Sequence, residues 1–481
     1  MARVTLRIEE LGPLRRTEAT FGDVTVIIGW PNTGKSYLLR ALYEALAPGD
    51  SRGLASCITS RLGDAPSAGG LVKVEAWRRG EEYGARICVQ LKGLAETLEK
   101  KMRECHRAGL LPPHRVEVHG VKRSVGLDEA ARRAALELLG ELGEDLQREG
   151  ARVSLLSPSA ETAVCLEAEG LRPKARGLGR WLSLARGGNE LEGIRFGLRL
   201  RLPPWRLVER TLAHAAPARV VYAAYGRSVA AQILLYSSMP VPDLGRAIEQ
   251  DVLREALGER SLPFLSLYEA IAGGYLELHR GTEAAKKALE VFKPLLMGRV
   301  EAVPGDLVYS WDGASISIKY ASALAGEASA LMLAVAGLLS QNSGERWLLI
   351  EEPEAQLHPA LQAIAAAVLL KLAAEENIKV ALTTHSDILA TVMLDLAAAA
   401  RERRLGKALR ELRELLGIDV PTLDEKRLRS IDVHVLYTEE AGAHAYRVRQ
   451  LSIEEALAEL PGLSDTLLNI ARWGLGQLIT R

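Results

Sequence analysis

The sequence lacks several features that mark large classes of protein. Lys plus Arg and Asp plus Glu both number 61, so no overall positive charge attracts nucleic acid. The most apolar run, Ala328 to Leu339, is well short of the roughly 20 residues that a membrane helix requires. The opening stretch MARVTLRIEELG alternates like a strand and has no apolar signal-peptide core. We therefore expect a cytoplasmic protein without a membrane association.

Cysteine is also scarce. The four cysteines are scattered and form no CxxC pair: Cys57, Cys88, Cys105 and Cys165. This pattern predicts neither a zinc site nor a disulfide framework, and it fits a reduced, intracellular protein. The remaining composition is ordinary, with 48% hydrophobic and 25% charged residues, which excludes a disordered or collagen-like chain. At 481 residues the chain is too long for one simple core, so we expect two or three lobes.

Hydrophobic periodicity divides the chain into four regions. Residues 1–93 contain alternating stretches around a helical segment, which indicates the N-terminal part of a mixed sheet. Residues 94–215 change to helical and mixed periodicity, as expected of an inserted lobe. Residues 216–400 alternate buried strands with helices, which predicts a parallel sheet flanked by helices. Residues 401–481 are expected to form a small C-terminal α/β extension.

Within these regions the pattern predicts individual elements. Strands are expected at Val4 to Ile8, Val24 to Ile28, Val72 to Trp77, Ala85 to Leu91, Arg152 to Leu156, Thr162 to Glu167, Ile194 to Leu202, Arg346 to Ile350, Lys379 to Thr383, Val433 to Tyr437 and Ala445 to Gln450. Helices are expected at Tyr37 to Ala47, Leu94 to Arg107, Leu127 to Arg148, Val229 to Leu257, Thr282 to Leu296, Gly326 to Leu339 and Pro359 to Ala374, with another at the end of the chain.

A phosphate-loop pattern, G-x4-G-K-[ST], lies between the second of these strands and the first helix. Its residues are Gly29, Trp30, Pro31, Asn32, Thr33, Gly34, Lys35 and Ser36. In this context backbone N–H groups cradle a β-phosphate, and the helix N-terminus adds positive potential. We expect Lys35 to reach the β- and γ-phosphates and Ser36 to ligate Mg²⁺. The alternative, a glycine-rich turn with an incidental lysine, does not account for the flanking strand and helix.

Two adjacent carboxylates follow a second buried strand in RWLLIEEPEAQLHP. The carboxyl end of such a strand is where open α/β sheets bind ligands. Glu351 is expected to hold Mg²⁺, and Glu352 to polarise the water that attacks the γ-phosphate. Without a cation the two carboxylates would repel each other. The alternative is that both acids only charge the approach to the helix that begins near Pro359.

A histidine follows a third buried strand in VALTTHSD. His385 is expected at the same sheet edge, where it could donate a hydrogen bond to the γ-phosphate or to the attacking water. Ser386 is expected to cap the following helix. A lone histidine after a strand is more often structural, and its two companion motifs favour the functional interpretation.

The fourth pattern is a small-residue turn at Gly326 and Glu327 that opens an apolar helix. Free N–H groups at the start of this helix could bind an anion. On local evidence an amphipathic core helix is an equally good interpretation.

With these four patterns the chain resembles the ABC-type ATPases of the SMC, RecF and OLD group, and especially standalone AAA-family proteins with the OLD-like ATPase head. LGPLRRTEATFGDVTVIIGWPNTGKSYLLRALY resembles that group's opening strands and Walker A motif. LLIEEPEAQLHP resembles its Walker B motif and D-loop, which includes His358, and VALTTHSDIL its switch-histidine strand. VVYAAYGRSVAAQIL is similar to a family segment that ends in an arginine turn, which makes Arg227 a candidate without an assigned role.

The resemblance implies a homodimer in which two heads clamp two ATP molecules. Each ATP would contact the Walker residues of one head and the signature helix of the other, here Gly326 and Glu327 in trans. The family usually has serine just before the signature glycine, whereas this chain has Ala325, with Ser322 further upstream. That departure suggests slow hydrolysis.

Other departures limit the resemblance. OLD nucleases continue into a Toprim domain, but no nuclease-type carboxylate cluster follows His385, so we expect no nuclease. The LSGGQ signature of transporter ATPases is missing, which makes a transporter ATPase a poorer interpretation. The sequence also has no NKxD guanine-binding motif, so ATP is favoured over GTP. The first hypothesis is therefore an ATPase with nucleotide-gated dimerisation that functions in DNA repair or in defence against mobile elements.

A rival hypothesis is a nucleotide-gated interaction module that scarcely hydrolyses ATP. It would bind a protein partner, such as a nuclease or effector, through the inserted lobe. DNA binding has no independent support, because basic clusters such as Lys122-Arg123 and the 401–404 stretch are short or mixed with acids.

Overall fold

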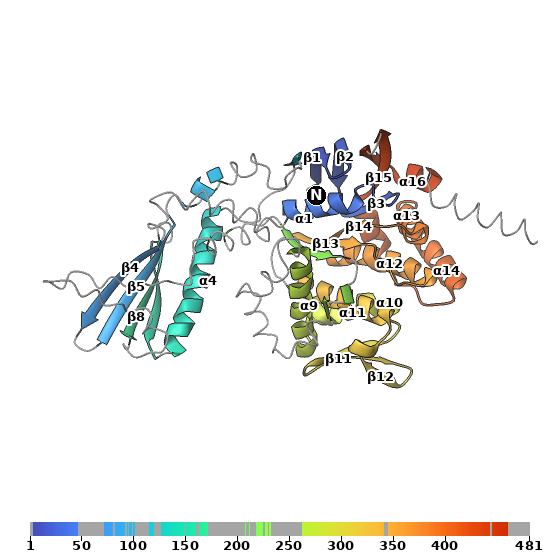
Figure 1. Ribbon diagram of the computed structural model, residues 1–481. Coiled ribbons are helices and arrows are strands. Elements are labelled where there is room, and N and C mark those ends of the chain that lie inside the picture. The colour runs from blue at the N-terminus through green and yellow to red at the C-terminus, as the bar shows by residue number, and fades with distance from the viewer. Residues whose placement is uncertain are drawn as a thin grey trace, which may run out of the picture. The chain divides into compact units, whose positions relative to one another are not determined.

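The computed structural model divides the chain into two compact units. The head unit comprises Met1–Leu46, Pro113–Lys122 and Ala218–Arg481, and the inserted unit comprises Ala47–Pro112 and Arg123–Pro217 (Figure 1). The structure describes residues 3–46, 72–79, 82–91, 115–119, 127–148, 150–159, 163–171, 218–224, 262–340, 345–442 and 445–459, with short runs between 94 and 101 and between 207 and 231. The strand expected at Ile194 to Leu202 lies outside the described residues, and only residues 230 and 231 of the helix expected at Val229 to Leu257 are described. The helix expected after the strand at Ala445 to Gln450 is described over Ile453–Glu459.

A nine-stranded mixed sheet forms the centre of the head unit. Its strand order is β6-β1-β2-β16-β15-β3-β14-β13-β9. The strands are β1 (Val4–Leu11), β2 (Leu14–Phe21), β3 (Val24–Gly29), β6 (Arg115–His119), β9 (Ala218–Ala223), β13 (Glu345–Glu351), β14 (Ile378–Thr383), β15 (Val433–Gly442) and β16 (Ala445–Leu451). The five strands from β15 to β9 run parallel, whereas β1 pairs antiparallel with β2 and β6, and β15 with β16.

The parallel strands form because both of their faces are buried. All six residues of β3 are buried, and β13 and β14 consist mainly of buried apolar residues. Every second side chain enters one large core under the helical layer, including Val26, Ile350 and Leu382. The intervening residues lie on the opposite face, where α1 (Lys35–Leu46) packs against β3, β13 and β14. This arrangement confirms the expected sheet flanked by helices.

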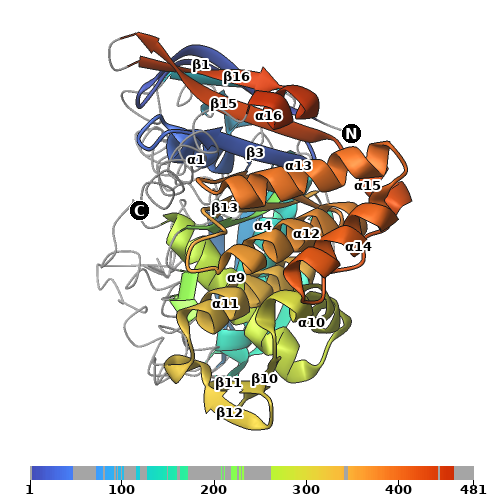
Figure 2. The same cartoon turned by 90° about the vertical axis from the view of Figure 1, so that its right-hand side faces the viewer.

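The helical layer of the head unit surrounds that core (Figure 2). It contains α9 (Leu262–Arg280), α10 (Glu283–Leu296), α11 (Ala323–Leu339), α12 (Pro359–Glu376), α13 (Asp387–Arg401), α14 (Leu405–Leu416), α15 (Glu425–Ser430) and α16 (Ile453–Glu459). Between α10 and α11 the chain forms an antiparallel meander of β10 (Arg299–Val303), β11 (Asp306–Trp311) and β12 (Ala314–Ser317). Nearly all of α11 is buried, so this helix is fixed by packing along its length.

Two expectations about the domains differ from this topology. The strands of residues 433–451 do not form a separate extension, because β15 lies beside β3 in the main sheet, with Thr438 opposite Gly29. The strands expected near residues 72–91 do not join the head sheet, because they pair with strands of the inserted unit. Alternation along a strand shows which face is buried, but it does not identify the neighbouring strand.

The described residues of the inserted unit include an antiparallel sheet and the long helix that packs on it. The sheet has the order β4-β5-β8-β7, formed by β4 (Val72–Arg79), β5 (Glu82–Gln90), β8 (Ala163–Leu171) and β7 (Arg152–Ser159). Helix α4 (Leu127–Arg148) packs on β7 and β8. Its buried residues recur three and four apart, as the sequence predicted for this segment: Leu127, Ala130, Ala131, Ala134, Ala135, Leu138 and Leu139.

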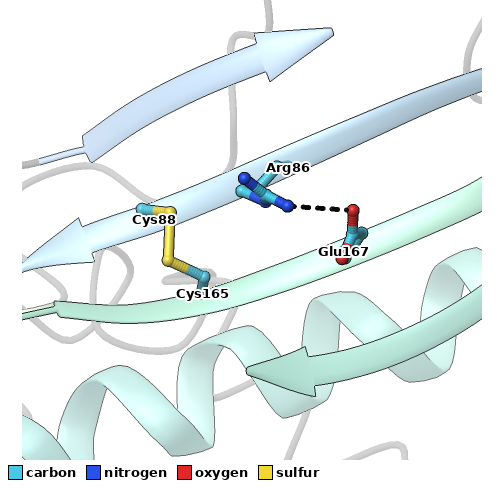
Figure 3. The surroundings of a disulfide bond; sticks show 4 residues. All are labelled: Arg86, Cys88, Cys165 and Glu167. Atoms are coloured by element: carbon cyan, nitrogen blue, oxygen red, sulfur yellow. Dashed lines mark hydrogen bonds and ion pairs between the residues drawn. A yellow bond between two sulfur atoms is a disulfide. The ribbon is translucent and has the colours of Figure 1, made fainter. Parts of the chain in front are cut away.

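A disulfide joins Cys88 of β5 to Cys165 of β8 (Figure 3). The two residues are direct partners in the strand register, and the Arg86–Glu167 ion pair, with Nη2 and Oε1 3.2 Å apart, lies beside them on the same two strands. The expectation of no disulfide is therefore wrong. The cysteines are 77 residues apart in sequence, and only the pairing of β5 with β8 brings them together.

None of the helices that the structure describes is long and apolar enough to cross a membrane.

Candidate functional site

The phosphate-loop residues connect β3 to α1. Gly29 ends β3 with φ +150°, Gly34 has φ +100°, and Lys35 is the first residue of α1. A Cβ atom at Gly29 would lie 2.0 Å from Thr438 Oγ1 of β15, so only glycine fits there. Asn32 also adopts a left-handed conformation, with φ +63°. The loop thus has the tight, glycine-dependent shape that turns backbone N–H groups inward.

Lys35 is held inside this loop. Its Nζ donates hydrogen bonds to the carbonyl oxygens of Gly29 at 2.9 Å and Trp30 at 2.7 Å, and the residue is only 5% exposed. Burial lowers the pKa of Lys35 to about 8, although the negative charges of Glu352 and Glu354 oppose the shift. The ammonium group therefore lies within the field of the carboxylates that follow β13.

The other loop residues differ in exposure. Thr33 is buried and donates to the Trp30 carbonyl at 2.8 Å, and its hydroxyl also bonds that of Thr438 at 2.5 Å. In contrast, Trp30, Pro31, Asn32 and Ser36 are exposed. The Ser36 hydroxyl is accordingly open to a ligand at the start of α1.

The end of β13 presents Glu351 close to the carboxyl end of the neighbouring parallel strand β9. The Tyr222 hydroxyl donates to Glu351 Oε1 at 2.6 Å. Burial raises the pKa of Tyr222, and the neighbouring Glu351 charge raises it further, so the phenol remains a donor. This bond orients the Glu351 carboxylate, as outer hydrogen bonds do for carboxylates that ligate metals.

Glu352 adopts an unusual backbone conformation directly after the strand. Its φ is +46°, a left-handed value that costs a non-glycine residue about 1–2 kcal/mol. Its N–H group donates to the Thr383 carbonyl of β14 at 3.0 Å. Left-handed geometry at a residue other than glycine, asparagine or aspartate persists only where the surroundings fix it, and such positions cluster in active sites.

His385 lies beside Glu352. Its Nε2 is 3.8 Å from Glu352 Oε1. Burial lowers the pKa of His385, the nearby Lys35 charge lowers it further, and Glu352 partly opposes both effects. Since the ordinary histidine pKa is about 6.5, His385 is neutral at pH 7, and its ring can accept or donate one proton.

A third carboxylate joins the two loops that follow β13 and β14. Glu354 Oε1 accepts from the His385 N–H at 2.7 Å. Burial raises the pKa of Glu354, and the backbone bond from His385 partly offsets the rise. The expected cap at Ser386 is confirmed, because its hydroxyl accepts from the Leu389 N–H at 3.0 Å. Sequence reasoning did not assign Glu354, whose only signal is its place in the EEPE pattern.

His358 is exposed and begins α12 as its N-cap. Its Nδ1 accepts from the Ala360 N–H at 3.3 Å. Within the head unit the residue therefore ends the segment after β13, and its ring remains accessible at the surface.

Arg227, which lies shortly after β9, has a defined set of partners. Its Nε donates to Glu327 Oε2 at 2.9 Å, and its Nη1 donates to the Glu351 carbonyl at 2.9 Å. Glu327 is itself buried, and its other oxygen accepts from the backbone N–H and the hydroxyl of Ser228. The Glu327 side chain is consequently turned into its own subunit.

The start of α11 differs from the expectation. The helix begins at Ala323, with Ser322 as N-cap, and the Ser322 hydroxyl accepts from the Ala325 N–H at 3.3 Å. The Gly326 N–H donates to the Ser322 carbonyl at 3.0 Å. The prediction of free N–H groups at Gly326 is therefore wrong: the serine cap moves the helix start one turn upstream, to a place that periodicity alone did not locate.

The structure thus brings most of the predicted residues to one sheet edge. β3, β13 and β14 run parallel, and the phosphate loop, the Glu351-Glu352 pair and His385 follow their carboxyl ends. Sequence reasoning missed Tyr222 and Thr438. Tyr222 lies in a buried-strand segment in which the sequence makes only Arg227 a candidate, and no sequence signal places Thr438 beside the loop.

Comparison with known proteins gives one match to a family model. Residues 276–390 match the model described as AAA ATPase domain. This span includes β13, the carboxylate pair and His385, but it does not include residues 29–36. Together with the strand, loop and helix at the phosphate loop, the match confirms the α/β P-loop NTPase fold class. No curated protein matches the chain.

Among solved structures, three heads of SMC proteins have remote similarity. An SMC head bound to the C-winged helix domain of ScpA is 11% identical, with a TM-score of 0.36 and coverage of 95% of this chain and 99% of that chain. An SMC head domain with an extended coiled coil, bound to the C-terminal domain of ScpA from Pyrococcus furiosus, is 12% identical (TM-score 0.33; 95% and 98%). The SMC head domain from Thermotoga maritima is 10% identical (TM-score 0.33; 94% and 100%). All three TM-scores lie below 0.5.

Proposed function

We propose that the head unit binds ATP and hydrolyses it slowly, as an ABC-type ATPase whose dimerisation depends on nucleotide. The observation that carries this proposal is the shared environment of Lys35, Glu352 and His385. The Glu352 charge raises the pKa of both Lys35 and His385, against the opposite effect of burial. Glu352 Oε1 lies 3.8 Å from His385 Nε2. A triphosphate on the phosphate loop would therefore lie close to an ammonium group, a carboxylate and a neutral imidazole.

Each residue has a separate role in this proposal. The loop N–H groups and Lys35 bind the phosphates and stabilise the charge on the transferring phosphoryl group. Glu352 orients and polarises the attacking water, and His385 contributes a hydrogen bond to that water or to the γ-phosphate. Because its pKa lies below the usual value, His385 can act in its neutral form at pH 7.

The oxygen donors near the loop fit Mg²⁺. The exposed Ser36 hydroxyl and the Glu351 carboxylate, oriented by Tyr222, are hard ligands of the kind that Mg²⁺ combines with phosphate oxygens and water. These two residues would hold the ion, which would neutralise charge on the β- and γ-phosphates.

We propose that the second half of each site comes from another copy of the chain. Because the Gly326 N–H and the Glu327 carboxylate are engaged within the subunit, the first turn of α11, after Ser322, is the part that would face a partner's γ-phosphate. Its helix dipole favours an anion, but Ala325 supplies no hydroxyl. This difference is consistent with slow turnover.

The test is steady-state hydrolysis of ATP with Mg²⁺ by wild type and by Lys35→Ala. A suitable control is Lys407→Ala, because Lys407 is exposed on α14 and forms an ion pair with Glu411, 3.6 Å away. We expect turnover in the wild type and in the control, and none above background in Lys35→Ala. Equal rates in wild type and Lys35→Ala would refute the proposed hydrolysis.

The second candidate function is a nucleotide-gated interaction module that controls a partner protein through the inserted unit. Ala325 and the inward-facing Glu327 favour it, since both weaken a trans contact that would support hydrolysis. If wild type hydrolyses ATP no faster than Lys35→Ala, while ATP still changes the oligomeric state measured by sedimentation, this second function replaces the first.

A role in DNA repair or in defence against mobile elements is the finer part of the proposal. The balanced charge of the chain gives it no independent support. Stimulation of hydrolysis by duplex DNA that declines steeply with salt would favour this role, and a rate that is unaffected by DNA would contradict it.

A further inference from the structure

Arg227 carries a buried charge, and it has no assigned role in the proposed hydrolysis of ATP. It is 2% exposed, and burial lowers its pKa, although the adjacent Glu327 charge opposes this effect. A guanidinium group in such a place must have its donors satisfied, because an unpaired buried charge is strongly destabilising. Its partners therefore show what the residue holds in place.

Those partners lie on two different parts of the head unit. One is the Glu327 carboxylate on the second turn of α11. The others are the backbone carbonyls of Glu351, 2.9 Å from Nη1, and Glu352, 3.4 Å from Nη2. The planar guanidinium group presents several donors in a fixed geometry, which an ammonium group cannot reproduce.

The Glu352 residue is consequently held from two directions. Its N–H group donates to the Thr383 carbonyl of β14 at 3.0 Å. Its carbonyl accepts from the Ala355 N–H at 3.0 Å and from Arg227 Nη2 at 3.4 Å. These bonds act on the residue whose φ is +46°. Left-handed conformations of residues other than glycine persist where the surroundings restrain them, and Arg227 supplies one of the restraints on Glu352.

Glu327, the other partner of Arg227, is held rigidly. Glu327 belongs to a helix that is buried along nearly its whole length, and its second oxygen is fixed by Ser228. Buried ion pairs contribute little net stability compared with apolar residues of similar volume. Positional control of the backbone after β13 therefore explains the pair better than stability does.

We propose that Arg227, anchored by Glu327, is a positioning residue that fixes the left-handed backbone of Glu352 and so aims the Glu352 carboxylate at the attacking water. This inference rests on the proposed ATPase function. It predicts that loss of Arg227 lowers kcat and leaves the affinity for ATP unchanged, because none of the Arg227 contacts involves the phosphate loop.

The main experiment uses the double variant Arg227→Met/Glu327→Met. Removal of both charges avoids the unpaired glutamate that Arg227→Met alone would leave, so we expect the double variant to melt closer to wild type than the single variant does. We expect its Kd for ATP to equal that of wild type and its kcat to be lower by about 10- to 100-fold. Arg227→Lys, which keeps the charge, should recover part of kcat.

The control for a purely structural effect is Lys371→Met. Lys371 forms a half-buried ion pair with Glu375 and also donates to the Thr422 carbonyl, outside the proposed site. This variant should lower the melting temperature without changing kcat. A double variant with wild-type kcat would overturn the inference.

A second readout separates this inference from the proposed function. Amide hydrogen exchange at Glu352 reports the hydrogen bond to Thr383 whether or not ATP is hydrolysed. We expect exchange at this amide to be at least about tenfold faster in the double variant than in Lys371→Met. If wild type fails to hydrolyse ATP but exchange still rises, the proposed function fails and the positioning role stands. If exchange is unchanged, the positioning role fails.

Discussion

The two units of this chain are stabilised and used in different ways. The head unit buries five parallel strands on both faces, and the residues proposed to bind ATP follow the ends of three of them. In its described residues the inserted unit has a small antiparallel sheet on which α4 packs, with a disulfide between neighbouring strands. A parallel sheet gathers loops from distant parts of the sequence at one edge, whereas a small antiparallel sheet is helped by a covalent link. Substitutions near the phosphate loop of the head unit should therefore change ATP binding. Substitutions in the inserted unit should change only the stability of that unit.

The largest effect is expected from Gly29→Ala in the head unit. The new Cβ atom would lie 2.0 Å from Thr438 Oγ1, at a φ of +150°. We expect a loss of about 3 kcal/mol in the free energy of unfolding and no measurable ATP binding. Denaturant unfolding and nucleotide titration measure the two quantities.

The control for Gly29→Ala is Gly305→Ala in the turn between β10 and β11. Gly305 also has a left-handed φ, +75°, but nothing lies within 4 Å of its added Cβ. It should cost about 1 kcal/mol and leave ATP binding intact. Normal ATP affinity in Gly29→Ala would contradict the assigned loop geometry.

In the inserted unit, Cys88→Ser should have the next largest effect. Loss of the link to Cys165, which closes a loop of 77 residues, should destabilise this unit by about 2–3 kcal/mol. We expect calorimetry to show a lower transition temperature for the inserted unit and an unchanged Kd for ATP.

Reductant provides the matched control for Cys88→Ser. Dithiothreitol should lower the stability of wild type to that of the variant and should not affect the variant further. If reductant leaves wild type unchanged, the disulfide does not support the unit.

A smaller effect is expected from pH on ATP affinity. Lys35 has a pKa of about 8 without nucleotide, because burial disfavours its charge. Below that pH the ammonium group is already formed. Above it, binding must take up a proton, so affinity should fall by up to about tenfold for each pH unit. Titrations from neutral pH to about pH 9.5 measure the slope.

Lys35→Arg is the matched variant, since arginine stays protonated throughout this range. Its affinity, whatever its value, should be independent of pH over the same interval. A flat wild-type profile would show that the Lys35 pKa is not lowered in the empty loop.

The smallest effect is expected from Glu167→Gln beside the disulfide. The Arg86–Glu167 pair is partly exposed, with 43% and 23% of the two side chains accessible. Solvent screens such a pair, so its loss should cost less than about 1 kcal/mol. A larger loss in urea unfolding would mean that the ion pair, rather than the disulfide, stabilises the inserted unit.

The contrast between the parallel sheet of the head unit and the antiparallel sheet of the inserted unit also explains which features the sequence could predict. The loop around Lys35, the pair Glu351-Glu352 and His385 were identified because each follows a buried apolar strand, and parallel strands end at a common edge. The strand partners were not predicted, so β15 was placed outside the sheet and β4 and β5 inside it.

Three features depended on contacts between distant residues. The Cys88–Cys165 link, the contacts of Arg227 and the position of Thr438 each follow from tertiary pairing, which leaves no mark in local periodicity. The start of α11 was missed for a local reason, because Ser322 caps the helix one turn before the glycine that suggested its beginning.

The most direct test of the central claim is a measurement of ATP turnover by Glu352→Gln, with bound nucleotide determined in the same samples. Glu301→Gln is the control, because it makes the same chemical change at an exposed residue of β10. We predict that Glu352→Gln retains ATP and forms a stable dimer while its kcat falls by about 10²- to 10⁴-fold, and that the control matches wild type. Normal turnover in Glu352→Gln would contradict the proposal that this edge of the sheet positions the attacking water.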